Sequence, residues 1–207
     1  MNFDDAVLKL RNGIGMLPGE EAHHLLAPVQ RLSTKEYLKQ NPSYKTSCVA
    51  VILYPDNNST RLLLMERPES THAHGGQISF PGGKREQDDV TLLDTAMREM
   101  YEEVGVAPSA VTMIGALSEI YIPVSNFLVH PFVGFSETKP VFQLNPGEVK
   151  NVVTPEIQYF FIKDLPSHRF ESRSFGWIDA PYFPYENHMI WGATAMIISE
   201  LIYILKR

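Results

Sequence analysis

The sequence has 207 residues but a single cysteine, Cys48, so an internal disulfide cannot form and a reducing compartment is expected. It has no internal repeat and no low-complexity tract. Its longest apolar run, residues 189–205, is shorter than a typical membrane span of about 20 residues and contains Glu200. We therefore expect a packed C-terminal helix over about 190 to 205, and no membrane partner.

Positive charge is also scarce. The chain has 18 Lys and Arg residues against 24 Asp and Glu, a formal net charge of −6, which argues against nucleic acid as a partner. The first ten residues carry two acids where a secretory signal has a basic region, so we expect no targeting segment and a cytoplasmic location. The composition, 44% hydrophobic and 20% charged, suits one soluble globular domain with an appended segment, of open oligomeric state.

The order of the expected elements indicates an α/β protein. Residues 1–45 are predicted to form an N-terminal helical extension with prolines as breaks, followed by a domain over residues 46–207. Strands are predicted where β-branched and aromatic residues concentrate, at residues 47–55, 61–67, 111–122, 128–135 and 158–162. Strands on both sides of a central helix, with another helix at the end, favour a helix–sheet–helix layering.

The clearest helix prediction covers residues 92–104. Thr91 can cap its start, with Asp94 placed three residues later as in a capping box. Gly105 stands where a glycine commonly ends a helix. Apolar residues recur along the segment at helical spacing and predict one face packed on the core.

Three acidic residues on this helix, Glu99, Glu102 and Glu103, share one face because they are spaced i, i+3 and i+4. They lie off the apolar stripe, so we expect them to face away from the core. Two such charges about 5 Å apart repel by roughly 3 kcal/mol at an effective dielectric near 20, which Arg98 offsets only in part. Mg²⁺ takes oxygen ligands from carboxylates and substrate phosphates, and a backbone carbonyl of the glycine turn at residues 82–83 could add another. The pattern therefore predicts a site for a hard divalent cation; alone, the three glutamates would indicate only a solvated helix face.

With the glycine turn included, these residues resemble the signature of the Nudix hydrolases. That signature is a glycine, an acid six residues later, and then R-E-U-x-E-E-x-G-U, where U is aliphatic. Gly83 and Asp89 match the first two positions, and residues 98–106 match the rest after a one-residue insertion. The resemblance implies a Nudix-like α/β/α sandwich with a mixed central sheet, and a diphosphate hydrolase that uses Mg²⁺ or Mn²⁺.

The resemblance also implies residue roles. Arg98 matches the arginine that orients the metal-binding glutamates, by pairing with Asp89 or with a glutamate. Glu148 lies in a later loop where some relatives place an extra carboxylate, as a ligand or as the general base. The implied metal ligands are Glu99, Glu102 and Glu103, to which the glycine turn would add the backbone carbonyl of Gly82. The candidates for the base that deprotonates the attacking water are Glu102, Glu103 and Glu148.

Residues 45–205 are more specifically similar to the coenzyme A pyrophosphatase branch of the family. The similar stretches include "FPGGK", "NPGEV" and "IWGATA", together with the one-residue insertion. This branch resemblance implies cleavage of coenzyme A or its derivatives to 4′-phosphopantetheine and adenosine 3′,5′-bisphosphate. The residues expected to bind the small-molecule diphosphate substrate are Arg67, His72, His74 and Lys84.

Two other functions stay open. His72 stands where that branch has arginine, so a residue mostly neutral at pH 7 replaces a permanently charged phosphate binder. The alternative substrate is therefore ADP-ribose or another nucleoside diphosphate derivative. A sensor that binds a nucleotide without cleaving it is a third hypothesis, against which the complete set of glutamates argues. Cys48, in an apolar strand, is expected to be a buried thiol and not a nucleophile.

Overall fold

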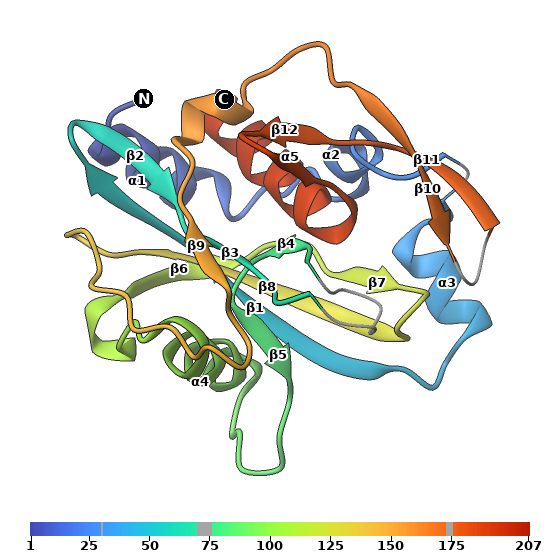
Figure 1. The fold of residues 1–207 in the computed structure, drawn as a ribbon, viewed down its shortest axis with the longest axis horizontal. Coiled ribbons are helices and arrows are strands. Elements are labelled where there is room, and N and C mark those ends of the chain that lie inside the picture. The colour runs from blue at the N-terminus through green and yellow to red at the C-terminus, as the bar shows by residue number, and fades with distance from the viewer. Residues whose placement is uncertain (30, 70–75, 173–175) are drawn as a thin grey trace.

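The computed structural model describes residues 1–29, 31–69, 76–172 and 176–207 (Figure 1). The helices are α1 (Phe3–Gly13), α2 (Glu20–His24), α3 (Thr34–Gln40), α4 (Leu92–Val104) and α5 (Gly192–Lys206). The strands up to α4 are β1 (Lys45–Asp56), β2 (Ser59–Leu62), β3 (Leu64–Glu66), β4 (Ile78–Ser79) and β5 (Gly82–Lys84). The strands after α4 are β6 (Thr112–Ala116), β7 (Ile120–Ile122), β8 (Phe127–Phe135), β9 (Asn151–Val153), β10 (Ser167–Ser172), β11 (Gly176–Pro181), β12 (Phe183–Tyr185) and β13 (His188–Ile190).

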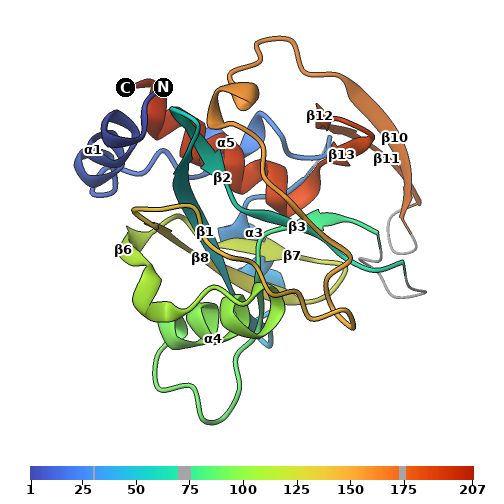
Figure 2. The same ribbon diagram turned by 60° about the vertical axis from the view of Figure 1, so that its left-hand side comes forward.

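The centre of the molecule is a six-stranded mixed sheet in which β1 and β8 run parallel side by side. Strands β2 and β5 pair antiparallel with β1, and β6 and β7 pair antiparallel with β8. Helix α4 covers one face of this sheet, whereas α5 and α1 cover the other (Figures 1 and 2). The α/β class, the layering and the mixed central sheet predicted from the sequence are therefore confirmed.

Strand β1 is buried on both faces, which explains its nearly continuous apolar sequence. Cys48, Ala50 and Ile52 pack into the cluster beneath α4, while Val51 and Leu53 pack into the cluster beneath α5. The side chains thus alternate between the two faces, as the two-residue period of a strand requires. Burial raises the pKa of the Cys48 thiol to about 11, in agreement with the predicted buried thiol.

The first 40 residues share the core of the rest of the chain. Ala6 and Leu10 of α1 are fully buried in the same apolar cluster as the residues of α5. Helices α1 and α5 approach closely at Gly13, where a Cβ would lie 2.4 Å from Cγ2 of Ile204. Among the helices of the described residues, none has both the length and the apolar character needed to cross a bilayer.

A buried carboxylate also links the N-terminal segment to α5. The Glu200 side chain on α5 is fully buried and accepts hydrogen bonds from the Gly19 N–H at 3.0 Å and the Ser118 N–H at 2.9 Å. The Ser118 hydroxyl donates to the same carboxylate at 2.6 Å, and His23 Nε2 lies 3.3 Å from it. Burial raises the pKa of Glu200, but the hydrogen bonds from His23 and Ser118 outweigh it and leave this pKa below the usual value.

Three predicted strands differ from the structure. Residues 61–67 do not form one strand, because the chain leaves the main sheet after β2 and enters a second sheet, β4-β3-β9, with β3. Residues 111–122 divide into β6 and β7, since the intervening Ser118 turns to bond Glu200. Residues 158–162 overlap a 3₁₀ turn at Ile157–Phe160, where Phe160 packs edge-on against Phe183 at 5.0 Å. Tertiary packing overrides the strand propensity of these aromatic residues.

Candidate active site

Helix α4 carries most of the predicted site, and local signals fix where it begins and ends. Thr91 and Asp94 form the predicted capping box, and Gly105 adopts the left-handed conformation with φ of 75°. Ala96, Met100 and Val104 are fully buried against β1. Strand β5 pairs with β1 in the sheet, so the helix face beside these apolar residues lies against β5.

The Glu103 carboxylate lies beneath the glycine turn. Oε2 accepts a hydrogen bond from the Gly82 N–H at 2.7 Å, and Oε1 lies 3.6 Å from Nη2 of Arg67. Only 1% of Glu103 is exposed, so the expectation that it faces away from the core is wrong. Burial raises the pKa of Glu103 to about 8, although Arg67 and the Gly82 N–H act in the opposite direction.

Glu99 lies one turn earlier on α4, against the other glycine of the turn. A Cβ on Gly83 would come within 2.3 Å of Oε1 of Glu99, so any larger residue at this position would displace the Glu99 carboxylate. Burial raises the pKa of Glu99, and the nearby Arg98 partly offsets that effect. The glycine turn therefore brings the backbone close to both carboxylates.

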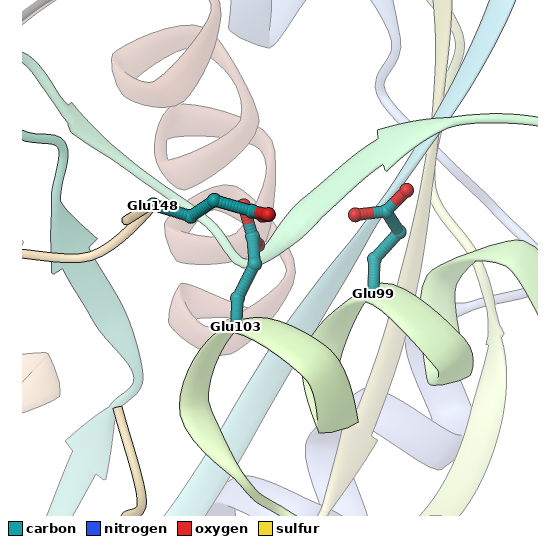
Figure 3. A group of neighbouring side chains, drawn as sticks. All are labelled: Glu99, Glu103 and Glu148. Atoms are coloured by element: carbon teal, nitrogen blue, oxygen red, sulfur yellow. The ribbon is translucent and has the colours of Figure 1, made fainter. Parts of the chain in front are cut away.

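A third carboxylate approaches from a distant part of the chain. Glu148 lies in the segment between β8 and β9 and is exposed. One oxygen each from Glu99, Glu103 and Glu148 can be chosen so that all three lie within 4.8 Å of one another. Figure 3 shows Glu99 and Glu103 rising from neighbouring turns of α4, with Glu148 reaching toward Glu103 from the facing segment. We call these three residues the acidic cluster.

Arg98 connects the carboxylates beside the acidic cluster. Its Nε and Nη2 donate to the two oxygens of Asp89, each at 3.0 Å, which confirms the predicted pairing. Its Nη1 donates to Glu99 at 3.0 Å and to Glu102 at 2.8 Å. The hydrogen bonds from Arg98 hold the pKa of Asp89 far below its usual value. Glu102 is half-exposed at this arginine and is not one of the three residues of the acidic cluster.

The other predicted site residues are only partly placed. Arg67 Nη2 donates to the Gly82 carbonyl at 3.2 Å, so the carbonyl predicted as a metal ligand already accepts one hydrogen bond. The Lys84 side chain is exposed, and its backbone carbonyl accepts a hydrogen bond from Arg98. His72 and His74 lie outside the described residues.

The chemistry of the acidic cluster fits a hard divalent cation. Its donors are carboxylate oxygens, which Mg²⁺ and Mn²⁺ prefer to nitrogen or sulfur. Burial favours the protonated form of Glu99 and Glu103, and a bound cation would favour the ionised form that can act as a ligand. Among the described residues, Arg67 pairs with Glu103 of the cluster at 3.6 Å and Arg98 pairs with Glu99 at 3.0 Å.

The fold and the acidic cluster together define a layered α/β protein with a candidate site for a divalent cation, and comparison with known proteins gives the family. A family model described as the NUDIX domain matches residues 45–179, and the chain belongs to the Nudix family. Members act on small-molecule diphosphates by hydrolysing phosphoanhydride bonds, generally with divalent ions such as Mg²⁺ or Mn²⁺.

Individual relatives are similar over the same region. The chain is 34% identical over 165 residues to Nudix hydrolase 15, mitochondrial, of Arabidopsis thaliana, covering 74% of this chain and 56% of that protein. It is 35% identical over 142 residues to the Nudix hydrolase NudL of Yersinia enterocolitica, covering 68% of this chain and 71% of that one. A solved structure, the Nudix hydrolase RenU of M. smegmatis, matches 56% of this chain with a TM-score of 0.47 and 17% identity.

The sequence did not indicate which residues hold Glu148 in place. Asn145 bonds both Glu148 and the end of α4, and Glu66 pairs with Lys150 at 2.7 Å. The stretch "NPGE" carries a turn signal, since Asn side chains often bond the backbone two residues on. Glu66 carries no local signal, because its partners lie more than 80 residues later in the chain.

Proposed function

We propose that this protein is a Mg²⁺- or Mn²⁺-dependent diphosphatase of the coenzyme A type. Its substrate would be coenzyme A or a derivative, and its products 4′-phosphopantetheine and adenosine 3′,5′-bisphosphate. The observation that carries the proposal is the approach of Glu99, Glu103 and Glu148 to within 4.8 Å of one another. Such an arrangement of like charges is unfavourable unless protons or a cation neutralise it.

The three carboxylates of the acidic cluster would hold the cation, and Glu102, which shares the Nη1 donor of Arg98 with Glu99, would border it. The ion, when bound, polarises a phosphoryl oxygen and acidifies water. Arg98 fixes Glu99, and the Gly82 N–H fixes Glu103, so neither carboxylate has to reorganise when substrate binds. Arg67, with a third of its side chain exposed, is available at the rim of the site to meet a phosphate.

In the reaction, the water oxygen forms a bond to one phosphorus, and the bond between that phosphorus and the bridging oxygen breaks. That oxygen leaves with the bonding electron pair on the second phosphate, and a carboxylate takes the proton of the water. We assign the proton to Glu148 because its carboxylate is exposed to water, whereas Glu103 is buried.

The choice of coenzyme A rests on the branch-like sequence around the site. Arg67 lies 3.6 Å from Glu103, and Thr194 of "IWGATA" donates a hydrogen bond to the Ile78 carbonyl at 3.1 Å. This second contact joins the start of α5 to the strand that leads into the glycine turn. The segments that resemble the coenzyme A branch therefore help to position the glycine turn, in addition to any contact with substrate.

One sequence feature favours ADP-ribose or another nucleoside diphosphate derivative as the alternative substrate. His72 replaces the arginine of the coenzyme A branch, so it offers one neutral donor in place of a charged fork at neutral pH. His72→Arg should raise kcat/KM for coenzyme A if the substrate site is of that type.

The test is turnover of a substrate panel by the purified protein with Mg²⁺ or Mn²⁺. The panel contains coenzyme A, an acyl-coenzyme A, ADP-ribose, NADH and a nucleoside triphosphate, and products are identified by mass. We expect the highest kcat/KM on coenzyme A or its acyl derivative. Preferred turnover of ADP-ribose would overturn coenzyme A as the substrate but leave the proposed diphosphate hydrolysis. Binding without turnover of any compound would favour the sensor hypothesis.

A further inference from the structure

The position of Glu148 depends on a long connection without regular structure. Residues 136–150 join β8 to β9, and among these described residues none belongs to a helix or strand. Glu148 is exposed and faces two other carboxylates, so electrostatic repulsion acts to push it away from the acidic cluster whenever those carboxylates are ionised, as they must be to bind a cation. Something else must hold this part of the connection against α4.

Asn145 provides the first attachment. Its N–H donates to the carbonyl of Glu103 at 3.0 Å, which joins the connection to the last turn of α4. Its side-chain amide donates to Oε1 of Glu148 at 3.3 Å, and its Oδ1 accepts from the Gly147 N–H at 3.1 Å. The Asn145 carbonyl also accepts from the N–H groups of Glu148 and Val149 at 3.0 and 2.8 Å. One residue therefore forms the turn that carries Glu148.

Glu66, the last residue of β3, provides the second attachment. Its Oε1 lies 2.7 Å from Nζ of Lys150, and its Oε2 accepts from the Asn151 side-chain amide at 3.2 Å. Its carbonyl also accepts from the Lys150 N–H at 2.8 Å. The Glu66 side chain is only 9% exposed, so the ion pair with Lys150 is shielded from solvent on the Glu66 side.

The neighbouring residue on the chain holds the opposite side of the acidic cluster. Arg67 directs its guanidinium to Glu103 and to the Gly82 carbonyl. Successive residues of an extended chain point to opposite sides, so Glu66 and Arg67 can hold two different parts of the site. The end of β3 thus connects the glycine turn with the segment that carries Glu148.

We propose that Glu66, through its ion pair with Lys150, is a positioning residue that acts with Asn145 to hold Glu148 in the acidic cluster. The inference rests on the proposed function, because it assumes that Glu148 contributes to cation binding. Neither Glu66 nor Lys150 is needed as a ligand. Their effect reaches the cation through the position of the Glu148 carboxylate.

The test measures Mn²⁺ affinity by electron paramagnetic resonance and by calorimetry, without substrate. Loss of a residue that orients a metal ligand typically weakens binding by about 10-fold, so Glu66→Ala and Lys150→Met should each weaken Mn²⁺ binding by about that factor. Lys150→Arg keeps the charge and should restore most of the affinity. Lys150 is half-exposed, so its variants keep the test valid if Glu66→Ala does not fold.

The matched control is Lys139→Met. Lys139 lies on the same connection and pairs with Asp56 at 3.0 Å, but it has no contact with the acidic cluster among the interactions of the described residues. Its removal should leave Mn²⁺ affinity unchanged. An equal loss in Lys139→Met and Lys150→Met would show a general effect on the connection and overturn the positioning role.

A double-mutant cycle separates this inference from the proposed function. If Glu66 acts through Glu148, Glu66→Ala should weaken Mn²⁺ binding in the wild type and have no further effect in Glu148→Gln. Equal losses in both backgrounds would overturn the inference. Unchanged affinity in Glu148→Gln, with loss in Glu99→Gln, would also overturn it while leaving a cation site on α4. Absence of Mn²⁺ binding in the wild type would remove the proposed function itself.

Discussion

Replacing Gly83 with alanine tests whether Glu99 needs the space that this glycine leaves open. A Cβ there would lie 2.3 Å from Cδ and Oε1 of Glu99 and 2.5 Å from Oε2. Non-bonded heavy atoms pack best at about 3.5 to 4 Å, so the carboxylate must retreat by about 1 Å. Because the obstacle is the end of a flexible side chain, the fold should survive. A displacement of about 1 Å at a catalytic constellation can cost about 100-fold, which is the loss of kcat/KM that we expect.

The adjacent glycine supplies the matched comparison. A Cβ on Gly82 would lie 2.2 Å from the Cys48 carbonyl oxygen and 2.7 Å from Cα of Val49. These atoms belong to the backbone of β1 at the centre of the sheet and cannot move aside as a side chain can. Gly82→Ala should therefore lower the free energy of unfolding by about 3 kcal/mol, the upper range for overpacking a well-packed site.

The two variants are compared by urea unfolding, by Mn²⁺ titration and by turnover. Gly83→Ala should unfold like the wild type but bind Mn²⁺ weakly and turn over slowly. Gly82→Ala should have a lower free energy of unfolding than the wild type, and this should be its main defect. Wild-type Mn²⁺ affinity and turnover in folded Gly83→Ala would refute the role of Glu99, and equal destabilisation of the two variants would refute the structural reasoning.

Three further substitutions have distinct expected results. Burial raises the pKa of Glu103 to about 8, so in the metal-free protein this carboxyl favours folding below its unfolded pKa near 4.5 and that contribution is lost as the pH rises through 8. Glu103→Gln should remove this decline, raise the melting temperature at pH 8 without metal, and abolish turnover; a lower melting temperature or near-normal turnover would contradict the assignment. Arg98→Lys replaces a fork that bridges Asp89 and two glutamates with a single nitrogen, so Mn²⁺ affinity in calorimetry should fall about 10-fold, and an unchanged affinity would count against the orienting role. Glu200→Ala leaves His23 and Ser118 without their buried partner, so urea unfolding should show a free energy of unfolding lower by about 3 kcal/mol. The Mn²⁺ affinity of the folded variant should equal that of the wild type. A loss of affinity would show that the N-terminal segment contributes to the cation site.

Local signals predicted α4 and its surroundings well, because each is contained within a few residues. The capping box at Thr91 and the final Gly105 are both present. The pairing of Arg98 with Asp89 or a glutamate came from the family resemblance, and the structure has both. The buried strand at residues 47–55 also follows from its own composition, since β1 is covered on both faces. The layering follows from the order of these elements.

The composition of the acidic cluster was not readable from helix spacing alone. Spacing groups Glu102 with the other two glutamates, but Arg98 binds the exposed Glu102 while Glu103 is buried beneath the Gly82 N–H. The distinction depends on where β5 lies, which is a long-range pairing with β1. Glu66 was missed for the same reason, because its partner Lys150 is distant in sequence.

The aromatic stretch at residues 158–162 was misread because strand propensity depends on packing. Its neighbours in space are Phe183 and Tyr185, which β12 brings from later in the chain. An isolated run of aromatic and β-branched residues fits a half-buried strand equally well. Only the tertiary contacts distinguish the 3₁₀ turn from a strand.

The most direct measurement for the account is a Mn²⁺ titration of the wild type and of Glu99→Gln/Glu103→Gln, followed by electron paramagnetic resonance with and without a diphosphate. The wild type should bind Mn²⁺, and more tightly when the diphosphate is present. The double variant should not bind Mn²⁺, although a cooperative unfolding transition should show that it is still folded. Equal Mn²⁺ binding by both proteins would contradict the assignment of the cation to the carboxylates of α4.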